Sequence, residues 1–180
     1  VLLACDIPLA AALRALGACA APPGRMESFG GEQGAPLAIV DYAHTPDALE
    51  KALAAARAHC SGQLSVVFGC GGDRDPGKRP QMAAIAAEHS DRVILTSDNP
   101  RSEDPDAIIA EMKEGVPVHL MRKVLSVTDR REAVRTACAL AKPGDIILLA
   151  GKGHEKYQII GKEKKYFDDC ETALEFLKRL

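Results

Sequence analysis

The chain has 180 residues and a net charge of −2, from 23 lysines and arginines against 25 aspartates and glutamates. Hydrophobic residues make up 47% of it, which is enough for one core without disulfides. Scattered basic residues and the lack of tryptophan argue against a protein that binds nucleic acid or a membrane surface. No apolar run reaches the roughly 18–20 residues of a membrane span.

Two features of the sequence bear on location. The start has no basic leader and no initiator methionine, so we expect no signal peptide and a chain that begins inside a longer protein. The six cysteines form no C-x-x-C pair, which favours reduced thiols that pack as small buried hydrophobes. We therefore expect a cytoplasmic protein, and a monomer.

The predicted elements begin with a helix near the start of the chain, where Leu9, Leu13 and Leu16 recur at helical spacing. Glycine and proline break the pattern at residues 21–24 and 30–34. Short apolar runs then alternate with amphipathic ones. The predicted strands are residues 37–40, 64–68, 92–96, 116–121, 145–150 and 157–160, the last at a sheet edge. The predicted helices are 46–60 capped by Thr45, 80–89, 105–114 capped by Asp104, one that Thr128 caps and that ends at Ala141, and one that starts at Asp168 or Asp169.

The alternation of strands and helices predicts parallel β-α-β units. Continuous apolar strands such as residues 146–149 favour a sheet that is covered on both faces. We therefore predict an α/β fold: a Rossmann-like three-layer sandwich with a mostly parallel sheet of about six strands and helices on both faces.

Four polar or glycine-rich loops follow predicted strands, at residues 41–46, 69–75, 97–101 and 151–155. In an open α/β sheet, ligands bind outside the carboxyl ends of the strands. We therefore expect the four loops to form one site at that edge. For any single loop, the alternative is ordinary turn chemistry and helix capping.

The second loop runs into a near match to the phosphate-binding P-loop, G-x-x-x-x-G-K-[ST], at residues 72–79. Arg79 stands where a serine or threonine hydroxyl should hold magnesium, and two aspartates inside the loop would repel phosphates. The loop also lacks the third glycine of a dinucleotide-binding G-x-G-x-x-G. We instead expect glycines that let a ligand approach the backbone, with Arg74 projecting into the pocket.

The third loop has the groups that recognise a zwitterion. Arg101 offers a planar fork for a carboxylate, Asp98 accepts from an ammonium group, and Asn99 both donates and accepts. Pro100 stiffens the loop. The alternative is a capped turn before the 105–114 helix, with Arg101 as a solvated charge.

The fourth loop adds Gly151, which exposes the backbone, and Glu155, a second partner for an ammonium group. His154 in the same loop is more often an ordinary polar residue than a catalyst. The chain has no G-x-S-x-G elbow, no H-E-x-x-H pair and no Cys/His cluster, so we expect neither a serine hydrolase of that type nor a metal site within it.

Five motifs together resemble the Mur ligase family. In order, they are GRME at 24–27, DYAHTPDAL at 41–49, FGCGGDRD at 68–75, TSDNPR at 96–101 and GKGHE at 151–155. The resemblance is strongest to the members that add the third residue to UDP-N-acetylmuramoyl-L-alanyl-D-glutamate. It implies that residues 29–180 form the third domain of a bacterial ligase and residues 1–28 the tail of the central domain. The true P-loop, the carboxylated lysine and most ligands of Mg²⁺ would lie in the central domain.

The resemblance also implies a reaction and its residues. ATP phosphorylates the D-glutamate carboxylate, and the amine of the incoming amino acid attacks the acyl phosphate. No residue of this chain is expected to be catalytic. The amino acid would be held by Arg74, Asp98, Asn99, Pro100, Arg101, Gly151 and Glu155. The nucleotide would face Arg25, Asp41 and His44. The chain alone, without the other two domains, is expected to be inactive.

Charge predicts the specificity. Family members that add meso-diaminopimelate carry Asp-Asn-Pro-Arg, whereas members that add lysine generally lack the arginine. Arg101 would stabilise the distal carboxylate that lysine lacks, which favours meso-diaminopimelate. The alternatives are a lysine-adding ligase, a folylpolyglutamate or cyanophycin type of ligase, or an α/β module that binds an amino acid or a nucleotide without catalysis.

Overall fold

The computed structural model describes residues 5–19, 22–32 and 35–179. Its centre is a six-stranded sheet with the order β1-β2-β6-β3-β4-β5. The strands are β1 (Glu27–Gly30), β2 (Leu37–Asp41), β3 (Leu64–Phe68), β4 (Arg92–Leu95), β5 (Val124–Ser126) and β6 (Ile146–Ala150). Only β1 runs antiparallel to its neighbour; the other pairings are parallel. The predicted fold class is confirmed.

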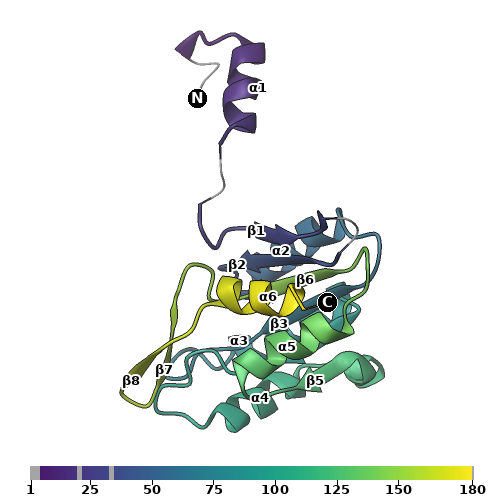
Figure 1. Cartoon of the computed structure of the whole chain (residues 1–180). Coiled ribbons are helices and arrows are strands. Elements are labelled where there is room, and N and C mark those ends of the chain that lie inside the picture. Colours follow the sequence, from purple (N-terminus) through teal and green to yellow (C-terminus); the bar gives the residue numbers. More distant parts are fainter. Residues whose placement is uncertain (1–4, 20–21, 33–34, 180) are drawn as a thin grey trace.

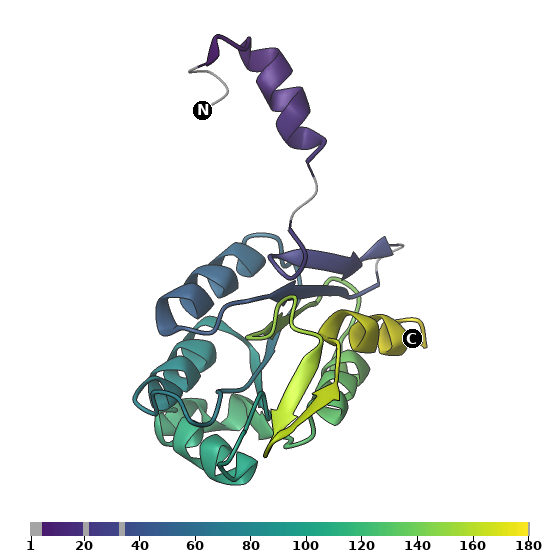
Figure 2. The same ribbon diagram turned by 90° about the vertical axis from the view of Figure 1, so that its left-hand side faces the viewer.

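Helices cover both faces of this sheet (Figures 1 and 2). One core cluster lies under α2 (Pro46–Arg57), α3 (Lys78–His89) and α4 (Pro105–Glu114). The other lies under α5 (Arg130–Leu140) and α6 (Asp169–Leu177). Alternate residues of one strand enter different clusters, as in β6, where Leu148 packs with the first and Leu149 with the second. This two-sided burial explains why the central strands are apolar throughout.

The helix starts follow the local sequence in most cases. Thr45 caps α2, with Pro46 in its first turn, and Asp104 caps α4. Asp168 caps α6 by accepting from two backbone N–H groups. The cap predicted at Thr128 is wrong. Asp129 caps α5 instead, because the Thr128 hydroxyl bonds Asp106.

Three other predictions need correction. Residues 116–121 are not a strand: the chain forms the 3₁₀ helix η3 (Val118–Lys123), and the adjacent strand is the short β5. The predicted break at 30–34 begins within β1, an edge strand that the sequence analysis missed. Residues 157–160 form β7 (Tyr157–Ile160), but it pairs with β8 (Glu163–Tyr166) in a separate hairpin and is not an edge of the main sheet. The exposed, lysine-rich β8 gave no apolar signal.

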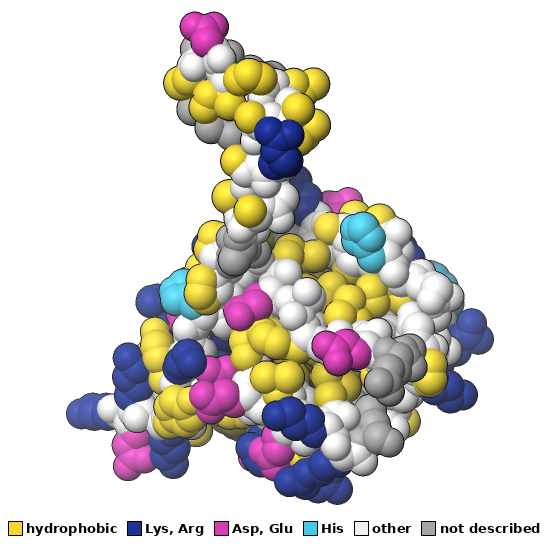
Figure 3. All heavy atoms as spheres, turned by 45° about the horizontal axis from the view of Figure 1, so that its top comes forward, with side chains coloured by type: hydrophobic (Ala, Val, Ile, Leu, Met, Phe, Trp, Pro, Cys, Tyr) yellow, Lys and Arg dark blue, Asp and Glu magenta, His cyan; other side chains and the backbone are white. Residues whose placement is uncertain are grey.

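The helix α1 (Leu9–Gly17) confirms the leucine periodicity and stands apart from the α/β body (Figures 1 and 2). Apolar side chains gather on it (Figure 3), and Leu9, Leu13 and Leu16 are each more than half exposed. Throughout the described parts of the chain, no helix has the length and apolar character that crossing a membrane requires. Of the six cysteines, Cys70 and Cys138 are buried, and Cys60 and Cys170 are partly buried against the two core clusters. The expectation of small buried hydrophobes is wrong for Cys5 and Cys19, which are exposed.

Candidate functional site

The four polar loops meet at one edge of the sheet, as predicted. They follow β2, β6, β3 and β4, which are neighbours and run parallel, so their carboxyl ends coincide. The loops surround a cavity of about 430 Å³. Its lining comprises Tyr42, His44, Thr45, Gly71, Arg74, Asp75, Lys78, Asp98, Asn99, Arg101, Gly151 and Glu155.

Six of the seven residues predicted to hold an amino acid line this cavity. They are Arg74, Asp98, Asn99, Arg101, Gly151 and Glu155. Pro100 does not; it lines a neighbouring cavity on the other side of its loop, beside Ser97 and Gln158. Among the three residues predicted to face a nucleotide, only His44 reaches the cavity.

The Gly-rich loop after β3 makes room for Arg101. A Cβ atom at Gly71 would lie 2.9 Å from Nη1 of Arg101 and 3.7 Å from Cγ of Arg74. Nη1 of Arg101 instead donates to the carbonyl of Gly72 at 2.7 Å. The absent side chain of Gly71 therefore leaves room for the Arg101 guanidinium beside Arg74, whereas the approach of a ligand to this backbone stays a prediction.

The segment that resembles a P-loop has a different function in this fold. The side chain of Arg79 is buried, pairs with Glu103 at 2.9 Å and Glu111 at 2.7 Å, and donates to the carbonyl of Gly71. The hydrogen bond that Arg79 donates to Glu103 raises the pKa of Arg79 above its ordinary value. Arg79 thus anchors the Gly-rich loop to α4, and the segment is not a cradle for a triphosphate.

Arg101 is held by a contact that the sequence analysis missed. Its φ of +53° is a left-handed conformation that L residues adopt rarely. Its N–H donates to the carbonyl of Ile159, and its carbonyl accepts from Gly161, both on the β7–β8 hairpin. The hairpin therefore fixes the backbone of Arg101 and compensates for its strain.

Asn99 was predicted to donate to and accept from a ligand, but most of its side-chain amide is bonded within the chain. Its Oδ1 accepts from the N–H of Ile159 at 2.9 Å and lies 3.3 Å from Nζ of Lys152. Its Nδ2 donates to Glu155 at 3.2 Å. One N–H of Asn99 has no partner within the described chain, so this residue mainly joins the two loops.

Lys152 is the site residue that the sequence analysis overlooked. Its side chain is fully buried beneath the cavity, 2.8 Å from Oδ1 of Asp98. Burial lowers the pKa of Lys152 below its ordinary value, and the carboxylate of Asp98 opposes that effect. The signal in the sequence was a lysine between two glycines at a strand end.

Gly151 gives the cavity its remaining wall. Its φ of +108° lies in a region that residues with a side chain adopt only with strain, so glycine is favoured at this position. A Cβ atom built there would face Oδ2 of Asp98 at 4.0 Å. Cys70, in the Gly-rich loop after β3, is buried against Met82, and burial raises the pKa of its thiol to about 12.

A family model described as "Mur ligase, glutamate ligase domain" matches residues 24–153 of the chain. The chain belongs to the Mur ligase family. It is 55% identical to a UDP-N-acetylmuramoyl-L-alanyl-D-glutamate--2,6-diaminopimelate ligase of Parasynechococcus marenigrum, over 99% of the chain and 36% of that protein. It is 52% identical to the protein of that name in Coxiella burnetii, over 96% of the chain and 35% of that protein.

Solved structures agree with this family membership. A structure titled as a UDP-N-acetylmuramoyl-L-alanyl-D-glutamate--2,6-diaminopimelate ligase superposes with a TM-score of 0.81 at 42% identity, over 98% of this chain and 36% of that one. A Yersinia pestis folylpolyglutamate synthase/dihydrofolate synthase, complexed with AMPPNP and a manganese ion, shares the fold with a TM-score of 0.59 at 21% identity, over 81% of this chain and 32% of that one. The chain spans about a third of the length of the curated relatives that it matches.

The DYAHTPDAL motif of this Mur ligase domain carries Asp41 and His44, two of the three residues predicted to face a nucleotide, and the GRME motif carries Arg25. The guanidinium of Arg25 lies 4.7 Å over the ring of Tyr42, and the Tyr42 ring also packs against His44 and His154. Nδ1 of His44 lies 2.8 Å from the carbonyl of Tyr42, to which it can donate. Asp41 instead accepts from two backbone N–H groups and braces the turn.

The described residues offer few groups that could bind a phosphate or a metal ion. Within residues 5–19, 22–32 and 35–179, no group of three or more His, Cys, Asp or Glu side chains could hold a metal ion. With Arg79 committed to Glu103 and Glu111, the described residues offer an aromatic and cationic surface but no triphosphate cradle.

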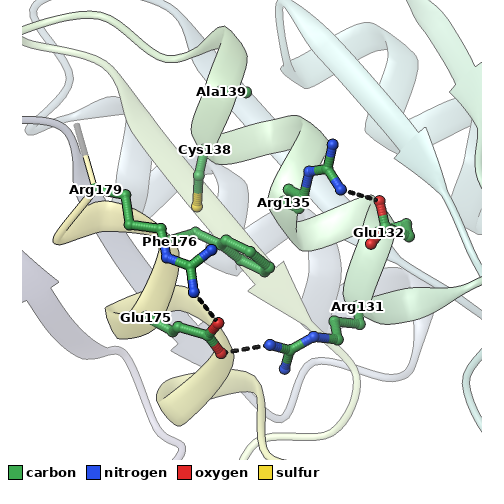
Figure 4. A pocket seen from close by; sticks show the side chains of 8 residues that line it. All are labelled: Arg131, Glu132, Arg135, Cys138, Ala139, Glu175, Phe176 and Arg179. Atoms are coloured by element: carbon green, nitrogen blue, oxygen red, sulfur yellow. Dashed lines mark hydrogen bonds and ion pairs between the residues drawn. The ribbon is translucent and has the colours of Figure 1, made fainter.

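A second cavity of about 370 Å³ lies on the outer face of α5 and α6. Figure 4 shows three arginines, Arg131, Arg135 and Arg179, around Phe176. Arg131 and Arg179 both pair with Glu175, and Arg135 pairs with Glu132. We call this the α5–α6 groove. Its cations are satisfied by carboxylates of the same two helices, and none of the predicted site residues lies there.

Proposed function

We propose that this chain is the amino-acid-binding domain of an ATP-dependent ligase that joins meso-diaminopimelate to UDP-N-acetylmuramoyl-L-alanyl-D-glutamate in bacterial cell-wall synthesis. The names of the relatives support the reaction. The observation that carries the substrate is one cavity lined by Arg74 and Arg101 together with Asp98 and Glu155. These are two guanidinium groups and two carboxylates within reach of one small molecule.

The charges of meso-diaminopimelate complement this lining. The molecule has a carboxylate and an amine at each end, so it presents two negative and two positive groups. Arg101 and Arg74 lie on one wall, where a guanidinium binds a carboxylate through parallel hydrogen bonds. Asp98 and Glu155 line the same cavity; Oδ1 of Asp98 is paired with Lys152, which leaves its Oδ2 and the Glu155 carboxylate to accept from ammonium groups. A ligand held at both ends presents its reacting amine in one orientation, which is catalysis by proximity.

The division of labour follows from the position of Arg79. We propose that ATP phosphates and Mg²⁺ are held by another part of the protein, because Arg79 blocks the near P-loop. Residues 29–180 are proposed as the amino-acid-binding domain and residues 1–28 as the tail of a preceding ATPase domain; α1 stands apart from the body, whereas Glu27 and Ser28 already pair with β2 in the main sheet. Arg25, Tyr42 and His44 would then meet the nucleoside when the domains close. The bacterial cytoplasm is the proposed location.

Specificity is proposed to rest on Arg101. Lysine lacks the distal carboxylate, so lysine in this cavity would leave a guanidinium unpaired, at a cost of about 2–5 kcal/mol. The test is Arg101→Ala in the gene product that contains this chain, assayed for phosphate release with the UDP-precursor, ATP and each amino acid. We expect the preference for meso-diaminopimelate over lysine to fall by roughly thirtyfold or more.

The control is Arg122→Ala, which removes an exposed arginine of η3. It should leave the preference unchanged. Undiminished discrimination in the Arg101 variant would contradict the proposal. Calorimetry on the wild type separates the alternatives. Binding heat with lysine but not with meso-diaminopimelate indicates a lysine-adding ligase. Binding without any turnover indicates a non-catalytic module.

A further inference from the structure

The ammonium group of Lys152 lies at the junction of three segments. The side chain is completely buried, and Nζ lies 2.8 Å from Oδ1 of Asp98 and 2.7 Å from the carbonyl of Tyr157. Oδ1 of Asn99 is 3.3 Å away. An ammonium group has three N–H donors. Two of them are directed to the carbonyl of Tyr157 and to Oδ1 of Asn99, while Asp98 contributes an ion pair whose Oδ1 accepts no hydrogen bond.

The partners of Lys152 come from different loops. Asp98 and Asn99 follow β4, Tyr157 begins β7, and Lys152 itself follows β6. Burial of a charged group is costly unless it is paired and hydrogen-bonded. The pairing with Asp98 and the two further acceptors meet that condition, so Lys152 ties the three segments together at one point.

Two short chains of hydrogen bonds connect the surroundings of Lys152 to the charged groups that line the cavity. Asn99 donates from Nδ2 to Glu155, which places that carboxylate. The N–H of Ile159 donates to Oδ1 of Asn99, and the carbonyl of Ile159 accepts from the N–H of Arg101. Displacement of Asn99 would therefore move both Glu155 and the backbone that carries the Arg101 guanidinium.

We infer that Lys152 is a positioning residue of the amino-acid pocket: by holding Asp98, Asn99 and the start of β7 in one arrangement, it sets the spacing of the groups that receive the amino acid. This inference rests on the proposed function. It assigns Lys152 no contact with the substrate. The role requires a buried positive charge beside Asp98 together with N–H donors to Asn99 and Tyr157, which methionine does not supply.

The test compares Lys152→Met with Lys156→Met in the gene product that contains this chain. Lys156 lies in the same loop, but its side chain is 63% exposed and pairs with Asp168 away from the cavity. Because a misplacement of about 1 Å can cost roughly 100-fold in rate, we expect Lys152→Met to raise KM for meso-diaminopimelate by about that factor. KM for ATP should stay within about twofold, and Lys156→Met should change neither constant. A merely structural defect would alter both constants of the Lys152 variant alike.

Hydrogen exchange without any ligand gives an independent readout. In the wild type, the backbone amides of Arg101, Ile159 and Gly161 should be protected, because each donates a hydrogen bond in the network. Lys152→Met should speed their exchange, and Lys156→Met should not. If the wild type neither binds nor consumes meso-diaminopimelate, the proposed function fails, but the exchange data still decide whether Lys152 organises the loops.

A double variant covers the case in which Lys152→Met does not fold. Lys152→Met with Asp98→Asn removes both charges, so no unpaired buried carboxylate remains. Faster exchange at Arg101 and Ile159 in this variant supports the inference. Unchanged exchange in whichever variant folds, or a KM for meso-diaminopimelate within about twofold of the wild type in the single variant, overturns it.

Discussion

The amino-acid pocket and the α5–α6 groove contain similar residues but differ in whether their charged groups are paired with each other. Both combine arginines with carboxylates around a cavity of similar size, about 430 Å³ and 370 Å³. In the groove, every arginine faces a glutamate on the same or the adjacent helix (Figure 4). In the pocket, loops from four strands hold Arg74 and Arg101 on one wall and Glu155 on another. Charge composition alone therefore does not identify a binding site; unpaired charges held apart by a scaffold do.

The largest effect on stability is expected for Arg130, the buried neighbour of the groove residue Arg131. Arg130 precedes Arg131 on α5, but its guanidinium pairs with Asp169 through two hydrogen bonds, and both side chains are fully buried. Arg130→Met leaves the carboxylate of Asp169 buried without a partner, which costs about 3–5 kcal/mol. Urea unfolding of the variant measures this loss. A loss of stability as small as that expected for an exposed ion pair would show that burial does not make the contribution of Arg130 larger than that of Arg131.

Glu155→Gln tests whether the pocket carboxylate binds the amine. The amide keeps the size of the side chain and removes its charge, so KM for meso-diaminopimelate should rise roughly thirtyfold or more, or about 2–5 kcal/mol. Glu175→Gln in the groove is the matched control and should leave all kinetic constants unchanged. Equal effects of the two substitutions would remove the distinction between pocket and groove.

The pH dependence of stability tests Asp168, which caps α6 beside the groove. Burial raises the pKa of this carboxyl, but the ion pair with Lys156 and the N–H groups of Glu171 and Cys170 bring it below its ordinary 3.8. The folded-state pKa thus lies below the unfolded one. Asp168 therefore stabilises the fold above about pH 4, and this contribution is lost as the pH falls through the folded-state pKa.

The measurement for Asp168 is the urea midpoint of the wild type and of Asp168→Asn, between about pH 6 and pH 3. The two curves should converge as the pH falls, because protonation removes in the wild type what the substitution removes at every pH. Parallel curves would contradict the assignment. Lys156→Met should reduce the convergence only in part, since the two N–H donors remain.

The smallest effect is expected for Arg131→Met. The side chain is 49% exposed, and its ion pair with Glu175 is solvated. Surface pairs of this kind contribute about 0–1 kcal/mol, so both stability and turnover should stay close to those of the wild type. A loss of turnover in this variant, at unchanged stability, would indicate that the groove also binds a ligand.

The sequence by itself determined the layered α/β fold and the edge at which the site lies. Continuous apolar runs and helical patterns are local, and parallel strands must align their carboxyl ends, so the loops at 41–46, 69–75, 97–101 and 151–155 had to converge. It also indicated that residues 72–79 are no phosphate loop, because Arg79 replaces the required hydroxyl. These conclusions need only spacing and residue type.

Only the tertiary structure decided which polar side chains face the cavity and which hold the loops. Asn99 and Asp41 looked like ligand-binding groups, yet the former bonds Lys152, Glu155 and Ile159, and the latter bonds two backbone amides. The edge strand β1 and the β7–β8 hairpin were likewise missed or misplaced, since exposed strands lack an apolar pattern. The bonds of Asn99 to Lys152 and Glu155 join residues more than fifty positions apart, so they depend on the path of the whole chain and nothing local in the sequence records them. The bond from Met26 to Asp41 likewise depends on the tertiary structure, because the pairing of β1 with β2 brings these residues together.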